Sequence, residues 1–141
     1  MLMVVINAEN ARVGRLATHV AKELLKGNEV HVVNAEKAVI SGNPKDIHAK
    51  YLERRSYQYK GDPDKSPKWP KTPNLFVRRL IRGMLPRKKA KGRAAYKRLR
   101  VYSGAPESVK GEAIVVKGAD KGALNKYVSV RELCRLLGHQ E

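Results

Sequence analysis

The segment between Arg82 and Arg100 carries the side chains of this sequence best suited to bind a ligand. Fourteen Lys and Arg residues, and no Asp or Glu, lie between Asp64 and Glu107. One guanidinium group can donate two parallel hydrogen bonds to a phosphate. Small residues such as Gly92 and Ala95 let the backbone approach a phosphate chain closely. Like charges three or four residues apart would destabilise a bare helix. The pattern therefore predicts contact with a polyanion, against the alternative of a solvated charged face.

The composition of the whole chain agrees with a polyanionic partner. Thirty Lys and Arg residues stand against thirteen Asp and Glu residues among 141, so the net charge is +17. Such an excess lowers the stability of the folded chain by self-repulsion unless a polyanion neutralises it. Nucleic acid fits this role because each phosphate that is neutralised releases a condensed counterion.

Residues for catalysis or metal binding are sparse. The chain has four histidines in different predicted elements, His19, His31, His48 and His139. Asp62 and Asp64 form a lone pair in a Pro-rich loop, whereas two-metal nucleases need several convergent carboxylates. No phosphate-binding or dinucleotide-binding glycine motif is present. We expect no catalytic residue, metal, cofactor or small-molecule substrate; a nucleic-acid enzyme using Asp62, Asp64 or His48 is the alternative.

The N-terminal part reads as a βαβ unit. The apolar run from Leu2 to Ile6 predicts a buried strand, and apolar residues at helical spacing predict a helix from Val13 to Leu25, with Gly27 as its stop. Val30–Val33 predicts a second strand, with a continuation at 38–40. Strand, helix and strand of these lengths imply a parallel pair with a right-handed crossover.

Two further helices flank a Pro-rich loop. Asn43 and Pro44 predict the start of a helix that ends near Arg54. Residues 56–74 hold four prolines and form a long loop, in which the aromatic residues Tyr57, Tyr59 and Trp69 stack on unpaired bases or fix the loop to the domain. We leave both interpretations open.

The second helix starts at Pro73 and is amphipathic. Its apolar side carries Phe76, Val77, Leu80, Ile81 and Met84, and its other side carries Arg78, Arg79 and Arg82. Pro86 ends it. Beyond Pro86 the segment 87–100 lacks an apolar stripe, so we expect the arm from Arg82 to Arg100 to be mobile in the free protein and ordered on RNA.

The C-terminal part predicts a short extended piece at 101–103, a strand at 113–117 and a closing helix. Ser129 and Glu132 have the spacing of a capping box before that helix, and the single cysteine, Cys134, lies on its apolar face as a buried residue. One cysteine, no signal peptide and no apolar run near the ~20 residues of a membrane span predict a soluble protein of a reducing compartment.

The elements together predict a single α/β domain over residues 1–141. We expect three layers, α/β/α, around a small, mostly parallel four-stranded sheet. A Pro-rich loop at 56–74, a basic helical arm at 82–104 and a strand–helix unit at 112–141 complete the predicted domain.

The run RLIRGMLPRKKAKGRAAYKRLRVYSG resembles the signature of the large-subunit ribosomal protein L13 family. VINAENARVGRLATHVAKELLKG, VVNAEKAVISG and the Lys50–Tyr51 pair are similar to further parts of that family, in the same order. The short first segment and the tail at 112–138 resemble its archaeal and eukaryotic branch. The resemblance covers nearly the whole chain.

The resemblance implies a structural, non-catalytic protein of the cytoplasmic ribosome that binds large-subunit rRNA and supports subunit assembly. Its other partners would be neighbouring large-subunit proteins, with no membrane and no obligate homo-oligomer. Carried over to this chain, the RNA-facing residues are Arg12, Arg15, Arg82, Arg87, Lys88, Lys89, Lys91, Arg93, Lys97, Arg98 and Arg100. To these we add Arg78 and Arg79 from the outer side of their helix, and Trp69 from the stacking interpretation. A non-ribosomal nucleic-acid binder, such as a basic chromatin protein, is the alternative.

Overall fold

The first strand, helix and second strand form the βαβ unit that the sequence predicts. The computed structural model describes residues 2–57, 60–62, 68–106, 113–116, 118–122 and 124–139. β1 (Met3–Asn7) and β2 (Glu29–Val33) pair in parallel, with Met3 opposite Glu29 and Asn7 opposite Val33. α1 (Val13–Leu25) connects them, and Gly27, at a φ of 98°, turns the chain after it.

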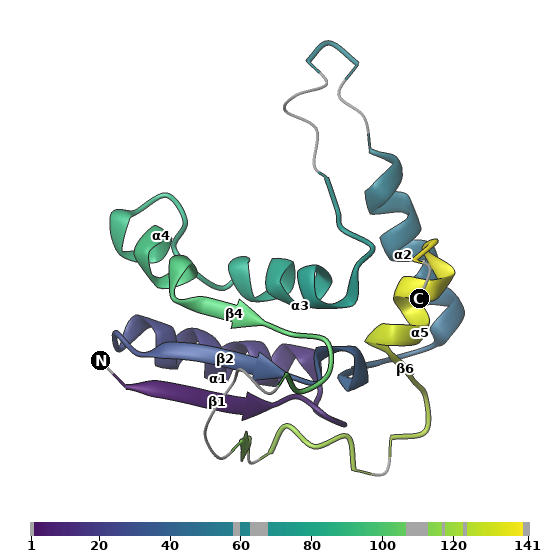
Figure 1. Cartoon of the computed structure of the whole chain (residues 1–141). Helices are drawn as coiled ribbons and strands as arrows, with labels where there is room; N and C mark the ends of the chain where they lie inside the picture. The colour runs from purple at the N-terminus through teal and green to yellow at the C-terminus, as the bar shows by residue number, and fades with distance from the viewer. Residues whose placement is uncertain are drawn as a thin grey trace.

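The main sheet has four strands in the order β4-β2-β1-β5, and all its pairings are parallel (Figure 1). β4 (Leu99–Val101) adds to β2, and β5 (Ile114–Val115) adds to β1. β4 therefore lies two residues earlier than the predicted extended piece, because Leu99 and Val101 are the side chains that become buried. β5 is shorter than the strand predicted over 113–117, and residue 117 lies outside the described part.

A second, two-stranded sheet corrects one prediction. The expected continuation of β2 at 38–40 is instead a separate strand, β3 (Val39–Ser41), which pairs antiparallel with β6 (Tyr127–Ser129). Asn34, in the left-handed region at a φ of 58°, and the 3-10 helix η1 (Ala35–Lys37) turn the chain away from the main sheet first.

Two helices, α2 and α5, begin at the caps that the sequence predicts. The Asn43 side chain accepts a hydrogen bond from the Lys45 N–H, 3.1 Å away, at the start of α2 (Pro44–Ser56). Ser129 accepts one from the Glu132 N–H, 3.2 Å away, at the start of α5 (Val130–Leu136). Figure 1 shows α2 extending away from the main sheet.

α3 (Pro73–Arg82) spans the core between the main sheet and α5. It packs against α1, β4, η1 and α5, and its residues Phe76, Val77 and Ile81 are fully buried. Met84 was expected on the apolar side of this helix, but the helix ends at Arg82 and the Met84 side chain is 45% exposed. Cys134 is buried, as predicted. The arrangement is consistent with the three-layer α/β fold expected from the sequence.

The largest difference from the prediction lies in the segment after Pro86. Residues 90–97 form α4 (Ala90–Lys97), which packs against α1, and Gly92 and Ala95 are buried. Leu85 before the helix and Leu99 after it are also buried, so both ends of the segment are fixed to the core. The expectation that this segment has too little apolar surface to order itself was therefore wrong: a few small contacts suffice between two anchored ends. Within the described residues, no helix is long and apolar enough to cross a membrane.

Candidate nucleic-acid interface

The outer side of α3 presents three arginines next to α4. Arg78, Arg79 and Arg82 are each half-buried, while the opposite side of the same helix is inserted in the core. The Arg78 guanidinium carbon lies 4.4 Å from the centre of the Tyr96 ring, which belongs to α4. Burial first, and then the neighbouring cations Arg79 and Arg87, lower the pKa of Arg82 below its ordinary value. Positive charge is therefore crowded here.

A second group of cations surrounds the start of α4. Five of them are exposed: Arg87, Lys88, Lys89, Lys91 and Arg93. No side chain caps this helix, and its first turn holds no acidic residue. The N-terminus of a helix carries a partial positive charge of its own, which adds to that of the side chains. We call Arg78, Arg79 and Arg82 together with these five residues the α3–α4 basic face.

Among the described residues, no carboxylate is paired with a cation of the α3–α4 basic face. The ion pairs of Lys26 with Glu23 and of His31 with Glu29 do not involve this face. The face is therefore a surface on which phosphates can replace water without first displacing a carboxylate.

Other predicted cations are used within the fold. Arg98 donates from Nη2 to the Leu24 carbonyl oxygen, 2.7 Å away, at the end of α1. Arg15 donates to the Gly118 carbonyl, 2.9 Å away, and Arg12 reaches the Lys121 carbonyl at 3.4 Å. These three arginines tie segments that are far apart in the sequence. Their contact with RNA stays a prediction.

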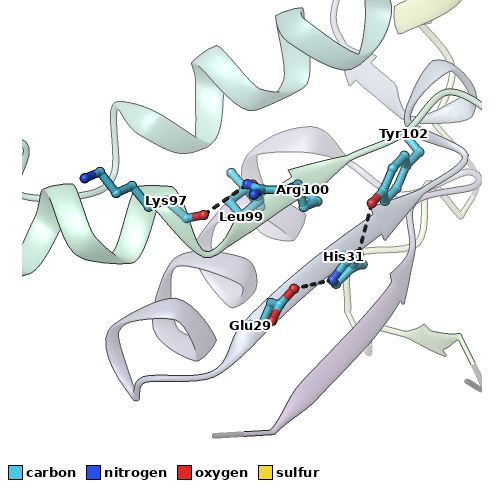
Figure 2. A network of polar contacts seen from close by, with 6 residues as sticks. All are labelled: Glu29, His31, Lys97, Leu99, Arg100 and Tyr102. Atoms are coloured by element: carbon cyan, nitrogen blue, oxygen red, sulfur yellow. Dashed lines mark hydrogen bonds and ion pairs between the residues drawn. The ribbon is translucent and has the colours of Figure 1, made fainter. Parts of the chain in front are cut away.

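Two sets of polar contacts lie on β4 and on the neighbouring strand β2 (Figure 2). Arg100 is exposed, and its guanidinium donates to the carbonyl oxygens of Lys97 and Leu99, at 3.0 and 3.1 Å. On the neighbouring strand His31 lies 2.7 Å from a Glu29 carboxylate oxygen and 3.2 Å from the Tyr102 hydroxyl. Both ring nitrogens of His31 thus have protein partners. Lys97 is exposed at the end of α4.

Trp69 lies among residues of the domain. Its ring centre is 5.6 Å from that of Tyr51 and 6.1 Å from that of Phe76. The guanidinium carbons of Arg54 and Arg79 lie 5.1 and 4.8 Å from it. These contacts favour the interpretation in which Trp69 fixes the loop to the domain.

The other aromatic residues of the loop have fewer described contacts with the domain than Trp69 has. Tyr57 is exposed and donates to a Glu53 carboxylate oxygen at 3.3 Å, and Tyr59 lies outside the described residues. Arg55 donates to the Trp69 carbonyl oxygen. Sequence reasoning missed the role of Arg54 and Arg55; a basic pair at the end of a helix that precedes an aromatic-containing loop was the available signal.

The candidates for catalysis are not brought together. Among the described residues, no group of three or more His, Cys, Asp or Glu side chains is placed to hold a metal ion. His48 lies on α2 with a buried Nε2 that has no partner, and Asp64 is outside the described residues.

Comparison with known proteins identifies the family. The family model for ribosomal protein L13 matches residues 2–108. The chain is 47% identical over 137 residues to the large ribosomal subunit protein uL13 of Methanococcus maripaludis, covering 96% of this chain and 98% of that protein. It is 45% identical to the uL13 of Methanopyrus kandleri, covering 96% and 87% of the two chains. For the uL13 of Methanocaldococcus jannaschii the identity is 44%, with 96% and 98% covered. The chain therefore belongs to the ribosomal protein L13 family.

Proposed function

We propose that this protein binds large-subunit rRNA through the α3–α4 basic face and supports assembly of the subunit. Its family is one of structural ribosomal proteins and not of enzymes, which supports a structural role in the large subunit of the cytoplasmic ribosome. The observation that carries the proposal is the crowding of eight cations on α3, α4 and the turn between them, with no carboxylate paired to them in the described part of the chain.

The fold makes this face a rigid platform. α3 is anchored by Phe76, Val77 and Ile81, and α4 is held between the buried residues Leu85 and Leu99. Because the backbone that carries these cations is anchored, binding has to order their side chains but not the backbone, so more of the interaction energy appears as affinity. Phosphates from two RNA segments could contact α3 and α4 at the same time, which would fix those segments relative to each other during assembly.

The salt dependence of binding tests the proposal. Protein-free large-subunit rRNA should bind the purified protein with an affinity that falls by roughly 10³–10⁵ between 50 and 200 mM salt, if about six to ten phosphates are contacted. The double variant Lys88→Gln/Lys89→Gln should lower the magnitude of the log–log salt slope by about 1–2, since each phosphate contact contributes roughly 0.7–0.9.

The matched control changes charge elsewhere. Lys45 and Lys126 are exposed at the start of α2 and just before β6, so Lys45→Gln/Lys126→Gln makes the same change in net charge outside the α3–α4 basic face. This control should leave the slope close to that of the unmodified protein. A flat slope, or equal losses in the two double variants, would contradict the proposal. Duplex DNA that competes as well as rRNA would instead favour a general nucleic-acid binder.

A further inference from the structure

We propose that a cleft beside α3 binds a single unpaired nucleotide of RNA, with the phosphate among arginines and the sugar and base on an apolar wall. The cleft has a volume of about 210 Å³. Its lining combines four cations, Lys68, Arg78, Arg79 and Arg82, with an apolar wall made of Pro70, Leu75 and Tyr96. This inference rests on the proposed function and names the kind of RNA that one part of the surface takes.

The charge of the cleft calls for an anion. All four of its charged residues are cations, and among the described residues none of them forms an ion pair with a carboxylate. The Nε of Arg78 is buried and has no hydrogen-bond partner among the described residues. An unsatisfied buried donor carries a free-energy cost. Burial, and then the neighbouring cations Arg79 and Arg87, lower the pKa of Arg82, and a phosphate in the cleft would offset the repulsion among these cations.

Two of the guanidinium groups are already positioned by aromatic rings. Arg78 lies over Tyr96 at 4.4 Å, and Arg79 lies over Trp69 at 4.8 Å. Arginine stacked on an aromatic ring keeps its outward N–H groups available for hydrogen bonds. The cleft is therefore organised for a phosphate before any ligand arrives.

The apolar wall distinguishes an unpaired nucleotide from a duplex. Leu75 is 44% exposed although it lies on a helix whose other large apolar residues are mostly buried, and it faces the same cleft as Pro70 and Tyr96. A base in an RNA duplex is stacked between its neighbours. A cleft on the protein can therefore contact the phosphates and sugars of a duplex but cannot take up one of its bases. An unpaired nucleotide can place its base against the apolar side while its phosphate meets the arginines.

The fluorescence of the protein can report on occupancy of the cleft. Trp69 is the only tryptophan of the chain, it lies between Lys68 and Pro70 in the sequence, and Arg79 contacts its ring. We would titrate the protein with an unpaired RNA tetranucleotide, with a short RNA duplex and with inorganic pyrophosphate. The tetranucleotide should change the emission of Trp69 at a concentration roughly tenfold lower than the duplex, as expected for one base in stacking or apolar contact.

The decisive variant shortens one side chain of the apolar wall, Leu75, and leaves the charge of the cleft unchanged. Leu75→Ala should weaken binding of the tetranucleotide by about three- to tenfold, and should leave binding of the duplex and of pyrophosphate as they were. The matched control is Leu136→Ala, at an apolar residue of α5 that is 50% exposed. It should leave the affinities for the tetranucleotide, the duplex and pyrophosphate unchanged.

Two outcomes overturn this inference: equal affinity for tetranucleotide and duplex, or a Leu75→Ala protein that binds the tetranucleotide as the unmodified protein does. In either case steep, salt-dependent binding to protein-free large-subunit rRNA would leave the proposed function standing. Failure of the unmodified protein to bind that rRNA would instead contradict the proposed function itself.

Discussion

Replacing Gly92 by alanine should destabilise this protein, although the same change stabilises most helices. A Cβ on Gly92 would lie 2.0 Å from the Pro86 carbonyl oxygen and 2.3 Å from its carbonyl carbon. The obstacle is backbone, and the turn that carries it is held by hydrogen bonds from Lys89 N to Pro86 O at 3.0 Å and from Arg87 N to Leu85 O at 2.8 Å. The helix α4 must therefore move away from the turn.

Two opposing contributions set the change that Gly92→Ala makes in the free energy of unfolding. Alanine in place of glycine within a helix gains about 1 kcal/mol, while overpacking of this kind costs about 1–3 kcal/mol and occasionally more. Because an approach of 2.0 Å is severe, we place the overpacking cost at about 2–4 kcal/mol, so the net loss in the free energy of unfolding is about 1–3 kcal/mol. That corresponds to a fall in Tm of roughly 3–10 °C for a domain of this size.

Urea unfolding of Gly92→Ala and Gly83→Ala measures the effect against a matched control. A Cβ on Gly83 would meet its nearest atom, the Leu80 carbonyl oxygen, at 3.5 Å, an ordinary contact, and the φ of Gly83 is −63°. Gly83→Ala should therefore change the stability little. A Gly92→Ala protein as stable as the unmodified one would refute the close packing of α4 on the Pro86 turn. Because Lys91 and Arg93 move with α4, the same variant should also bind rRNA more weakly.

Three other predictions test separate contacts. Burial raises the pKa of the Cys134 thiol to about 12, so about one molecule in 10⁴ is a thiolate at pH 8; a thiol reagent should label the protein only after unfolding, and rapid labelling of the folded protein would contradict this. Arg98→Ala removes the bond to the Leu24 carbonyl and should cost about 1–3 kcal/mol in urea unfolding, whereas Lys97→Ala, at an exposed residue, should cost much less. Asn43→Ala should lower the free energy of unfolding by about 1 kcal/mol through loss of the α2 cap; an unchanged urea midpoint would show that the cap contributes nothing.

Local patterns were enough to predict the elements whose signals lie within a few residues. The strand–helix–strand unit at the N-terminus follows from apolar spacing, and the starts of α2 and α5 follow from Asn43 and Ser129, whose side chains bond the next turn of their own helices. The signal and the contact are then adjacent in the sequence. The end of α1 near Gly27 was predictable for the same reason.

Contacts between distant segments were not predictable in this way. Gly92 was interpreted as a small residue that lets a phosphate chain approach, but in the structure it accommodates the Pro86 carbonyl. The pairing of β3 with β6 brings Val39 opposite Ser129, and nothing in either short segment indicates its partner. The order of segment 87–100 was underestimated because the segment has no apolar stripe, whereas its residue Leu99 is fully buried in the main sheet.

The sequence also shows how many cations there are without showing which of them the fold uses. Arg12, Arg15 and Arg98 bond to backbone carbonyl oxygens, and a carbonyl satisfies a guanidinium donor without cancelling its charge. The geometry of these arginines is therefore fixed while the net charge of +17 stays in place. Carboxylate partners would have fixed them equally well, but they would have weakened the field around the protein. Carbonyl partners let the same residues hold the fold together and still add to the field that attracts a polyanion.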